Sequence, residues 1–260
     1  MGMNTKSYFD SHGHHDAYHM DPNLCSELAH YMINDMKKRT TDLHEGIRIL
    51  DIGCGDGIFI KSMINNGLKA DFMGLDLSST MIAMAKKNIS DLNDYNIELF
   101  TADGFNLPLK SNLKFNVILI DSVLHHLIGK TRSKSVDLAT KMIGSLMDRL
   151  SEKGLLIVGE VYYNSYLISP LTSLLIFYSL KLLNLLHLDL HHILKEVQLG
   201  LEVSFLYEKE LQKLLECYSG NVYVIKKYPS NISKLRRFLF LKECGYVCFV
   251  VNKNSFKPKR

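Results

Sequence analysis

The sequence has five cysteines but no CxxC pair and no metal-finger spacing, and it has no tryptophan. Small disulfide-stapled domains and zinc fingers both depend on short cysteine spacings. The cysteines therefore exclude a disulfide framework and a cysteine metal site, and they predict a reducing, cytoplasmic setting. The first fifteen residues contain no apolar core and no cleavage pattern, so we expect no secretion signal.

Charged residues are absent from one run of twenty residues, 161–180, which is long enough to cross a bilayer. Pro170 interrupts this run, and polar side chains recur at helical spacing after it, from Lys181 to Lys195. We therefore expect one or two amphipathic helices here and not a transmembrane span.

Acidic residues are scarce near the C-terminus. The last forty residues carry ten Lys and Arg but only one acid, Glu243, although the net charge of the whole chain is only +4. Such a segment either attracts an anionic partner or is a solvated basic rim.

Apolar runs of strand length alternate with helical patterns along most of the chain. This alternation predicts an α/β fold: a doubly wound, mostly parallel seven-stranded sheet with helices on both faces and a helical insertion after the fifth strand. We expect four parts, which are an N-terminal helical lid segment (1–45), a core (46–160), an apolar helical insertion (161–205) and the last strands of the core (206–260).

The stretch ILDIGCGDG, residues 49–57, carries the strongest chemical signal. A strand followed by Gly53, Gly55 and Gly57 lets the backbone approach a ligand closely at the carboxyl end of a sheet. No Gly-Lys-Ser/Thr follows, which excludes a phosphate-binding P-loop, and the spacing differs from that of dinucleotide enzymes. Asp76 ends the next predicted strand, where a carboxylate can accept both hydroxyls of a ribose.

Four motifs stand in order along residues 47–160: LDIGCGDG, GLDLSSTMIAMAK, TADGFNLPL and FNVILIDSVLHHL. In these motifs the chain resembles the class I, Rossmann-like S-adenosylmethionine-dependent methyltransferases, in particular the methyltransferase type 11-like group that acts on small molecules and lipids. The resemblance implies S-adenosyl-L-methionine as the cofactor and S-adenosyl-L-homocysteine as the product.

The resemblance also implies cofactor contacts for the motif residues. In the family these residues surround the cofactor: Asp51, Gly53, Gly55 and Gly57 border its methionine part, Asp76 holds the ribose, Leu77 and Met81 pack on the adenine, and Asp103 with Gly104 meets the adenine amine. An aromatic residue before the first motif commonly covers the cofactor, and Tyr8, Phe9 and Tyr18 are the candidates. The motif residues also have structural interpretations, such as helix core for Met81 and a turn for Asp103.

Methyl transfer to oxygen or nitrogen calls for a base that takes a proton. Asp121 ends the fourth predicted strand, at the sheet edge where cofactor and substrate should meet. In the related phosphobase methyltransferases, a D-x-x-L-H run supplies a substrate-contacting Asp and a catalytic His that pairs with an N-terminal Tyr. Asp121, His125 and Tyr18 match these roles, and Glu160 at the end of the fifth strand is a further polar candidate. The alternatives are packing of His125 and a helix-capping or solvated role for Glu160.

The N-terminal segment contains His12, His14, His15 and His19, and the last two have a spacing that could share a metal. Apart from Asp16, no acid or cysteine completes the set, so we predict a lid without metal.

The apolar insertion indicates the chemical class of the methyl acceptor. A cover rich in Leu, Ile, Phe and Tyr suits an apolar or amphiphilic molecule, such as an isoprenoid, a quinone precursor or a lipid, reached from a membrane surface. The insertion also fits self-packing or a homodimer interface. A small polar metabolite, a nucleic acid and a non-catalytic regulatory role stay open; nucleic acid is disfavoured because no NPPY-like or paired-Cys motif is present.

Overall fold

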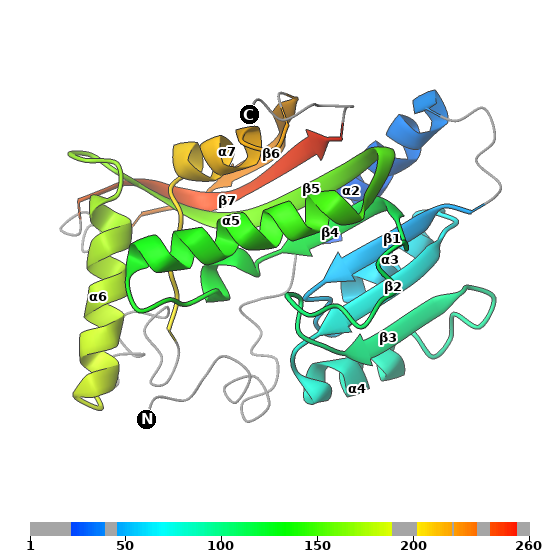
Figure 1. Cartoon of the computed structure of the whole chain (residues 1–260), viewed down its shortest axis with the longest axis horizontal. Helices are drawn as coiled ribbons and strands as arrows, with labels where there is room; N and C mark the ends of the chain where they lie inside the picture. The colour runs from blue at the N-terminus through cyan, green and yellow to red at the C-terminus, as the bar shows by residue number, and fades with distance from the viewer. Residues whose placement is uncertain (1–21, 40–45, 189–201, 220, 233–239, 254–260) are drawn as a thin grey trace.

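The computed structural model describes residues 22–39, 46–188, 202–219, 221–232 and 240–253. Its centre is a seven-stranded sheet of order β3-β2-β1-β4-β5-β7-β6 (Figure 1). The strands are β1 (Arg48–Ile52), β2 (Asp71–Asp76), β3 (Ile97–Thr101), β4 (Phe115–Asp121), β5 (Leu150–Ser165), β6 (Val222–Pro229) and β7 (Leu241–Asn252). The first five run parallel, and β7 lies antiparallel between β5 and β6. The predicted doubly wound sheet is confirmed.

Helices cover both faces of the sheet. The helices are α2 (Pro22–Arg39), α3 (Ile58–Asn65), α4 (Ser79–Asn88), the short 3₁₀ helix η2 (Leu124–His126), α5 (Arg132–Arg149), α6 (Leu171–Leu185) and α7 (Glu208–Glu216). Side chains of α2, α3 and α4 pack into one buried cluster, and those of α5 and α7 pack into a second. The central strands are therefore apolar on both faces: Ile49, Leu50 and Ile52 of β1 are at most 2% exposed.

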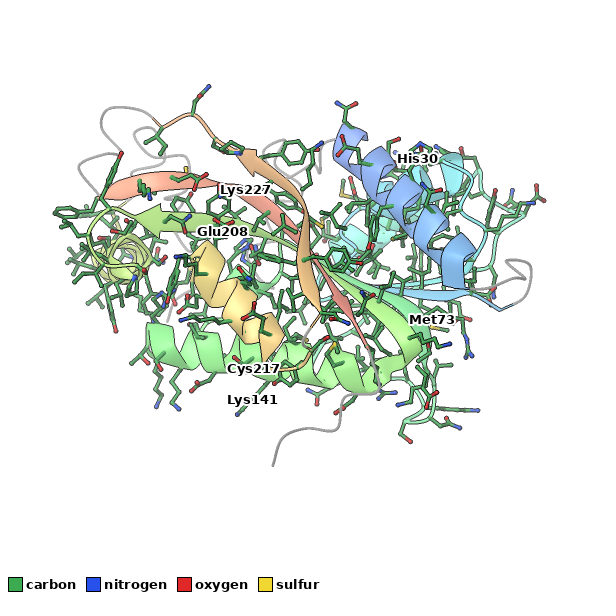
Figure 2. The ribbon with its side chains drawn as sticks, turned by 90° about the horizontal axis from the view of Figure 1, so that it is seen from above. His30, Met73, Lys141, Glu208, Cys217 and Lys227 are labelled. Carbon is green, nitrogen blue, oxygen red and sulfur yellow. The ribbon has the colours of Figure 1, made fainter. Side chains whose placement is uncertain are left out.

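Ion pairs join β6 to helices α7 and α2 and to the neighbouring strand β7. In Figure 2, Lys227 of β6 lies near Glu208, the first residue of α7, and its Nζ is 2.7 Å from a Glu208 oxygen and 3.1 Å from one of Glu243. Lys226 pairs with Glu27 of α2 at 2.9 Å. Two of the basic residues near the C-terminus are thus engaged with acids of this chain.

The strand before the insertion, β5, extends further than its sequence pattern predicts. β5 continues to Ser165, so residues 161–165 pair with β7 instead of opening the insertion. α6 then stands across the strand direction, beyond the end of β5 (Figure 1). Lys181 anchors it by donating to the carbonyls of Gly129 and Lys130, each at 3.0 Å. Among the residues the structure describes, no helix is long and apolar enough to span a membrane.

Candidate functional site

The glycine turn follows β1 at the carboxyl end of the sheet. Gly53, Gly55 and Gly57 all have positive φ, at 74°, 54° and 75°, a region that side chains with a Cβ rarely adopt. A Cβ on Gly53 would lie 2.3 Å from a methyl of Val123 in the loop after β4. The turn therefore requires glycine for both its backbone angles and its close packing.

Three aspartates surround this turn, one at the end of each of β1, β2 and β4. Asp76 accepts hydrogen bonds from the N–H groups of Gly55, at 3.1 Å, and Ser78, at 2.8 Å. Asp51 is only 3% exposed, and its Oδ2 is buried without a hydrogen-bond partner in the described structure. Burial, reinforced by the charges of Asp121 and Asp76, raises the pKa of Asp51 to about 8.

Asp121 is the third aspartate. Its Oδ1 accepts a hydrogen bond from the hydroxyl of Tyr246 on β7. Burial raises the pKa of Asp121 to about 6, against the opposing effect of the Tyr246 hydrogen bond. The site therefore holds one buried and two partly buried carboxyl groups at close quarters, a setting that favours a cationic ligand.

His125 and Glu160 form a buried pair beside the aspartates. Nδ1 of His125 is 2.5 Å from Oε1 of Glu160, and the backbone N–H of His125 donates to Oε2 at 3.2 Å. The two residues are 2% and 0% exposed. Phe205 packs on the His125 ring with 5.3 Å between centroids, and Ser204 donates its N–H to the His125 carbonyl at 2.8 Å. The pair is therefore held from several sides, and the burial of Glu160 excludes the solvated alternative.

The predicted adenine-side residues lie at the same edge but in different environments. Met81 is 5% exposed, and its Cε is 3.4 Å from where a Cβ of Gly55 would stand, whereas Leu77 is 42% exposed. Asp103 is exposed and accepts from the N–H of Phe105 at 2.9 Å, which is the turn role that its sequence also allowed. A Cβ on Gly104 would lie 3.3 Å from Ile52, so this turn packs against the end of β1.

Several predicted residues lie outside the described residues, namely Tyr8, Phe9, Tyr18, His12, His14, His15 and His19. Their roles as lid or catalytic partner stay predictions. In the part of the chain that the structure describes, no group of three or more His, Cys, Asp or Glu could hold a metal.

Two residues of the site were missed at the sequence level, Tyr246 and Phe205. Tyr246 lies in the last strand, 125 positions after the aspartate that it contacts. Phe205 lies at the end of the insertion and stacks on both His125 and Tyr163. Neither stands in a recognisable motif, because both reach the site only through the late strand pairing and the return of the insertion.

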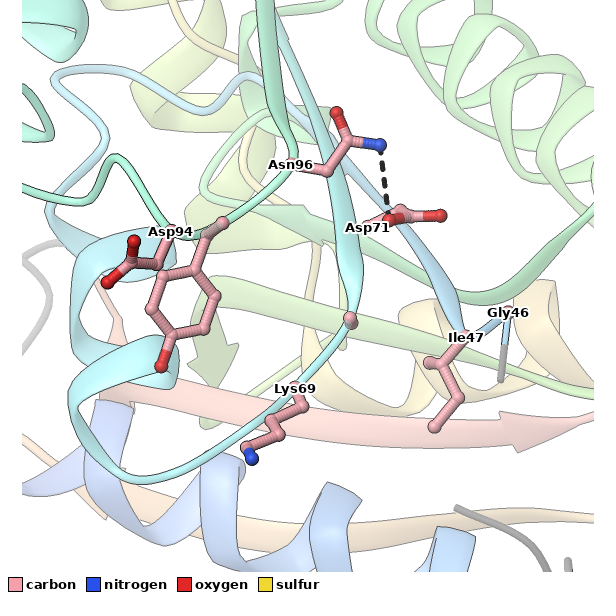
Figure 3. A pocket seen from close by; sticks show the side chains of 8 residues that line it. Gly46, Ile47, Lys69, Asp71, Asp94 and Asn96 are labelled. Carbon is pink, nitrogen blue, oxygen red and sulfur yellow. Dashed lines mark hydrogen bonds between the residues drawn. The ribbon is translucent and has the colours of Figure 1, made fainter. Parts of the chain in front are cut away.

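A separate hollow of about 500 Å³ lies at the opposite, amino-terminal edge of the sheet (Figure 3). Lys69, Asp71, Tyr95 and Asn96 are among its lining residues, and Asn96 donates to Asp71 at 3.1 Å. None of the described residues that the sequence predicted for the site lines this hollow.

Comparison with known sequences identifies the central segment. Residues 49–143 match a family described as a methyltransferase domain. A malonyl-acyl-carrier-protein O-methyltransferase of Priestia megaterium is 34% identical over 87 residues, 33% of this chain and 30% of that protein. A ubiquinone biosynthesis O-methyltransferase of Glaesserella parasuis is 30% identical over 164 residues, 60% of each chain. The chain thus spans no more than 60% of the length of these curated relatives.

Comparison with solved structures extends over most of the chain. The YcgJ protein of Bacillus subtilis has a TM-score of 0.58 at 14% identity and covers 87% of this chain and 100% of its own. Magnesium protoporphyrin IX methyltransferase of Synechocystis PCC 6803, solved with bound S-adenosylhomocysteine, has a TM-score of 0.55 at 16% identity and covers 95% and 97%. The fold is shared with these structures, and residues 49–143 match the methyltransferase domain family.

Proposed function

We propose that this protein is an S-adenosylmethionine-dependent methyltransferase that methylates a hydroxyl group of an apolar or amphiphilic acceptor, such as a quinone precursor, an isoprenoid or a lipid. The observation that carries the proposal is the buried Oδ2 of Asp51, which has no hydrogen-bond partner among the described residues and lies beside the glycine turn. A buried carboxylate without a partner is costly unless a bound ligand supplies a donor or a positive charge.

The site residues fit this cofactor. Its sulfonium and ammonium groups are cationic, and Asp51 and Asp121 place one buried and one partly buried carboxyl group at the edge where a methionine part would lie. Asp76 would accept the ribose hydroxyls, and Met81 and Leu77 would border the adenine. The bound cofactor would supply a methyl group on a positively charged sulfur, which is a good leaving group.

His125 is the proposed general base. Its Nδ1 faces Glu160 at 2.5 Å, so the opposite ring nitrogen, Nε2, is left to take the proton of the acceptor hydroxyl. Glu160 would stabilise the imidazolium that forms, as the carboxylate of a catalytic triad does for its histidine. Nε2 of His125 would take the proton of the acceptor hydroxyl, and the bound cofactor would supply the methyl group that this oxygen receives.

The insertion supports an apolar acceptor. Leu180 of α6 belongs to a buried cluster with Tyr163 and Phe205, and Phe205 packs directly on His125. The apolar insertion is therefore in packing contact with the proposed base. A cover of this kind excludes water and encloses an apolar molecule. The names of the curated relatives, which include O-methyltransferases of ubiquinone biosynthesis, point the same way.

We extend the proposal to peripheral contact with an anionic membrane surface. The outer side of α6 exposes Tyr178, Leu182, Leu185 and Leu186, at 49%, 54%, 75% and 55%, in a stripe of helical spacing. Lys181 is the only charged residue of the helix. An exposed apolar stripe with few charges is the surface that an interfacial helix presents to lipid. A homodimer interface is the competing use of the same stripe.

Calorimetric titration with S-adenosylmethionine tests the cofactor assignment. We expect the wild type to bind it and Asp51→Asn to bind it at least tenfold more weakly, because the variant loses a charge–charge interaction. Asp71→Asn, at the far edge of the sheet, is the matched control and should bind normally. Absence of binding to the wild type would contradict the proposed function.

Co-sedimentation with vesicles of phosphatidylglycerol and phosphatidylcholine tests the membrane surface. The wild type should pellet with the vesicles, and Leu182→Ser/Leu185→Ser should stay in solution. A wild type that stays in solution but dimerises in light scattering, with the dimer lost in the same variant, would assign the stripe to a homodimer.

A further inference from the structure

Asp121 occupies a point where the backbone itself is constrained. The next residue, Ser122, has φ of 54°, a left-handed conformation that is uncommon for a residue other than glycine. Its N–H donates to the carbonyl of Gly159 on β5 at 3.0 Å. Such outliers persist only where the surrounding structure holds them, and they concentrate at functional sites. Asp121 is therefore held in place by its chain as well as by its side-chain contacts.

Gly159 creates the space in which Asp121 meets Tyr246. It pairs with Asp121 on one side and with Cys248 of β7 on the other, so it lies between the two strands that carry the contact. A Cβ at position 159 would lie 1.8 Å from the Tyr246 hydroxyl oxygen and 1.9 Å from Oδ1 of Asp121. Any larger residue would displace one or both groups, because real Cβ atoms do not approach other atoms so closely.

We propose that Tyr246 is a positioning residue that fixes the Asp121 carboxylate at the edge of the cofactor crevice by reaching across Gly159. The proposal rests on the proposed function for its meaning, since Asp121 would border the methionine part of the cofactor. The tyrosine hydroxyl can donate to only one acceptor, and it donates to Oδ1. Tyr246 therefore holds one of the two carboxyl oxygens of Asp121.

The contact also sets the protonation of Asp121. The groups that face this carboxyl from the surrounding elements are Tyr246 and Cys248 on β7, Glu160 on β5, His125 on η2, Ser122 after β4 and Asp51 on β1. Burial raises the pKa of Asp121, and the hydrogen bond from Tyr246 lowers it. Loss of the hydroxyl should therefore raise this pKa above its present value of about 6.

The test follows the carboxyl carbon of Asp121 by NMR during a pH titration of the ligand-free protein, with Asp121→Asn to assign the signal. Tyr246→Phe should raise the pKa of Asp121 by about one unit, the size of a typical hydrogen bond to a charged group. Gly159→Ala should move it in the same direction, and the double variant should show less than the sum of the two shifts. Tyr228→Phe, which removes a hydroxyl that contacts Glu27 on the surface, is the matched control.

Affinity for S-adenosylmethionine provides the second measurement. At pH 6, Tyr246→Phe should bind about fivefold more weakly than the wild type, and the difference should shrink at pH 7.5. An unshifted Asp121 signal in Tyr246→Phe, with the protein folded by circular dichroism, would overturn the positioning role. A wild type that binds no cofactor would instead contradict the proposed function, while the NMR titration would still decide whether Tyr246 controls Asp121.

Discussion

Cofactor affinity should depend steeply on pH because Asp51 must ionise to meet a cation. With a pKa of about 8, roughly one Asp51 side chain in ten is ionised at pH 7 and one in a hundred at pH 6. If the cation binds the carboxylate and not the neutral acid, the affinity should rise by nearly tenfold for each pH unit between 6 and 7.5.

Calorimetric titration with S-adenosylmethionine between pH 5.5 and 7.5 measures this slope. The upper limit keeps the ligand's α-amino group charged, since such groups titrate near pH 7.7–8.0. Asp121 adds a second inflection near pH 6, so Asp51→Asn isolates its contribution: this variant should bind weakly and keep only the bend near pH 6. A flat profile in the wild type, or an equally steep profile in Asp51→Asn, would refute the reasoning.

The remaining predictions concern stability, the turn, the base and the buried arginine. Asp51 is ionised in the unfolded chain above about pH 4 but resists ionisation in the folded protein up to about pH 8, so it lowers the free energy of unfolding as pH rises through this window. Asp51→Asn should therefore raise the melting temperature at pH 7.5 but not at pH 4, and an equal change at both would contradict the assignment. Gly53→Ala should abolish cofactor binding and lower the free energy of unfolding in urea by roughly 1–3 kcal/mol, because the alanine would have a strained φ and would clash with Val123. Normal binding would show that the turn can adjust to a side chain at position 53. His125→Ala and Glu160→Gln should lower methyl transfer by about 10²–10⁴-fold, with calorimetric cofactor affinity changed by less than threefold; full activity would return His125 to a packing role. Arg132→Met should destabilise the protein by about 3–5 kcal/mol in urea unfolding, because the guanidinium is buried and donates to Glu210 and to the Phe205 carbonyl. The control Lys134→Met removes only an exposed ion pair and should change the free energy of unfolding by less than ~1 kcal/mol.

The mostly parallel sheet and its cofactor edge could be predicted because they depend on local signals. β2 and β4 are short apolar runs that end in an aspartate, β1 carries Asp51 one residue before its end, and the alternation with helices indicates a parallel sheet. Asp51, Asp76 and Asp121 reach one edge simply because the carboxyl ends of parallel strands share it. The placement of these aspartates at one edge therefore follows from the parallel direction of the strands.

The contacts of the late segments could not be predicted from local patterns. Tyr246 reaches Asp121 only because β7 lies antiparallel beside β5. Gly159 of β5 leaves room for the Tyr246 side chain, and no sequence motif indicates that contact. The role of Glu160 was also undecided, since a carboxylate at a strand end has the same sequence pattern whether it is solvated or buried against His125. Tertiary packing settled both cases.

Labelled methyl transfer tests the central claim most directly. The wild-type protein is incubated with methyl-labelled S-adenosylmethionine and a lipid-containing cell extract, which is then partitioned into organic, aqueous and nucleic-acid fractions, with His125→Ala as the control. We predict label in the organic fraction with the wild type and at least a hundredfold less with His125→Ala. Label confined to the aqueous or nucleic-acid fraction would contradict the apolar acceptor, and cofactor binding without transfer to any fraction would contradict the enzyme itself.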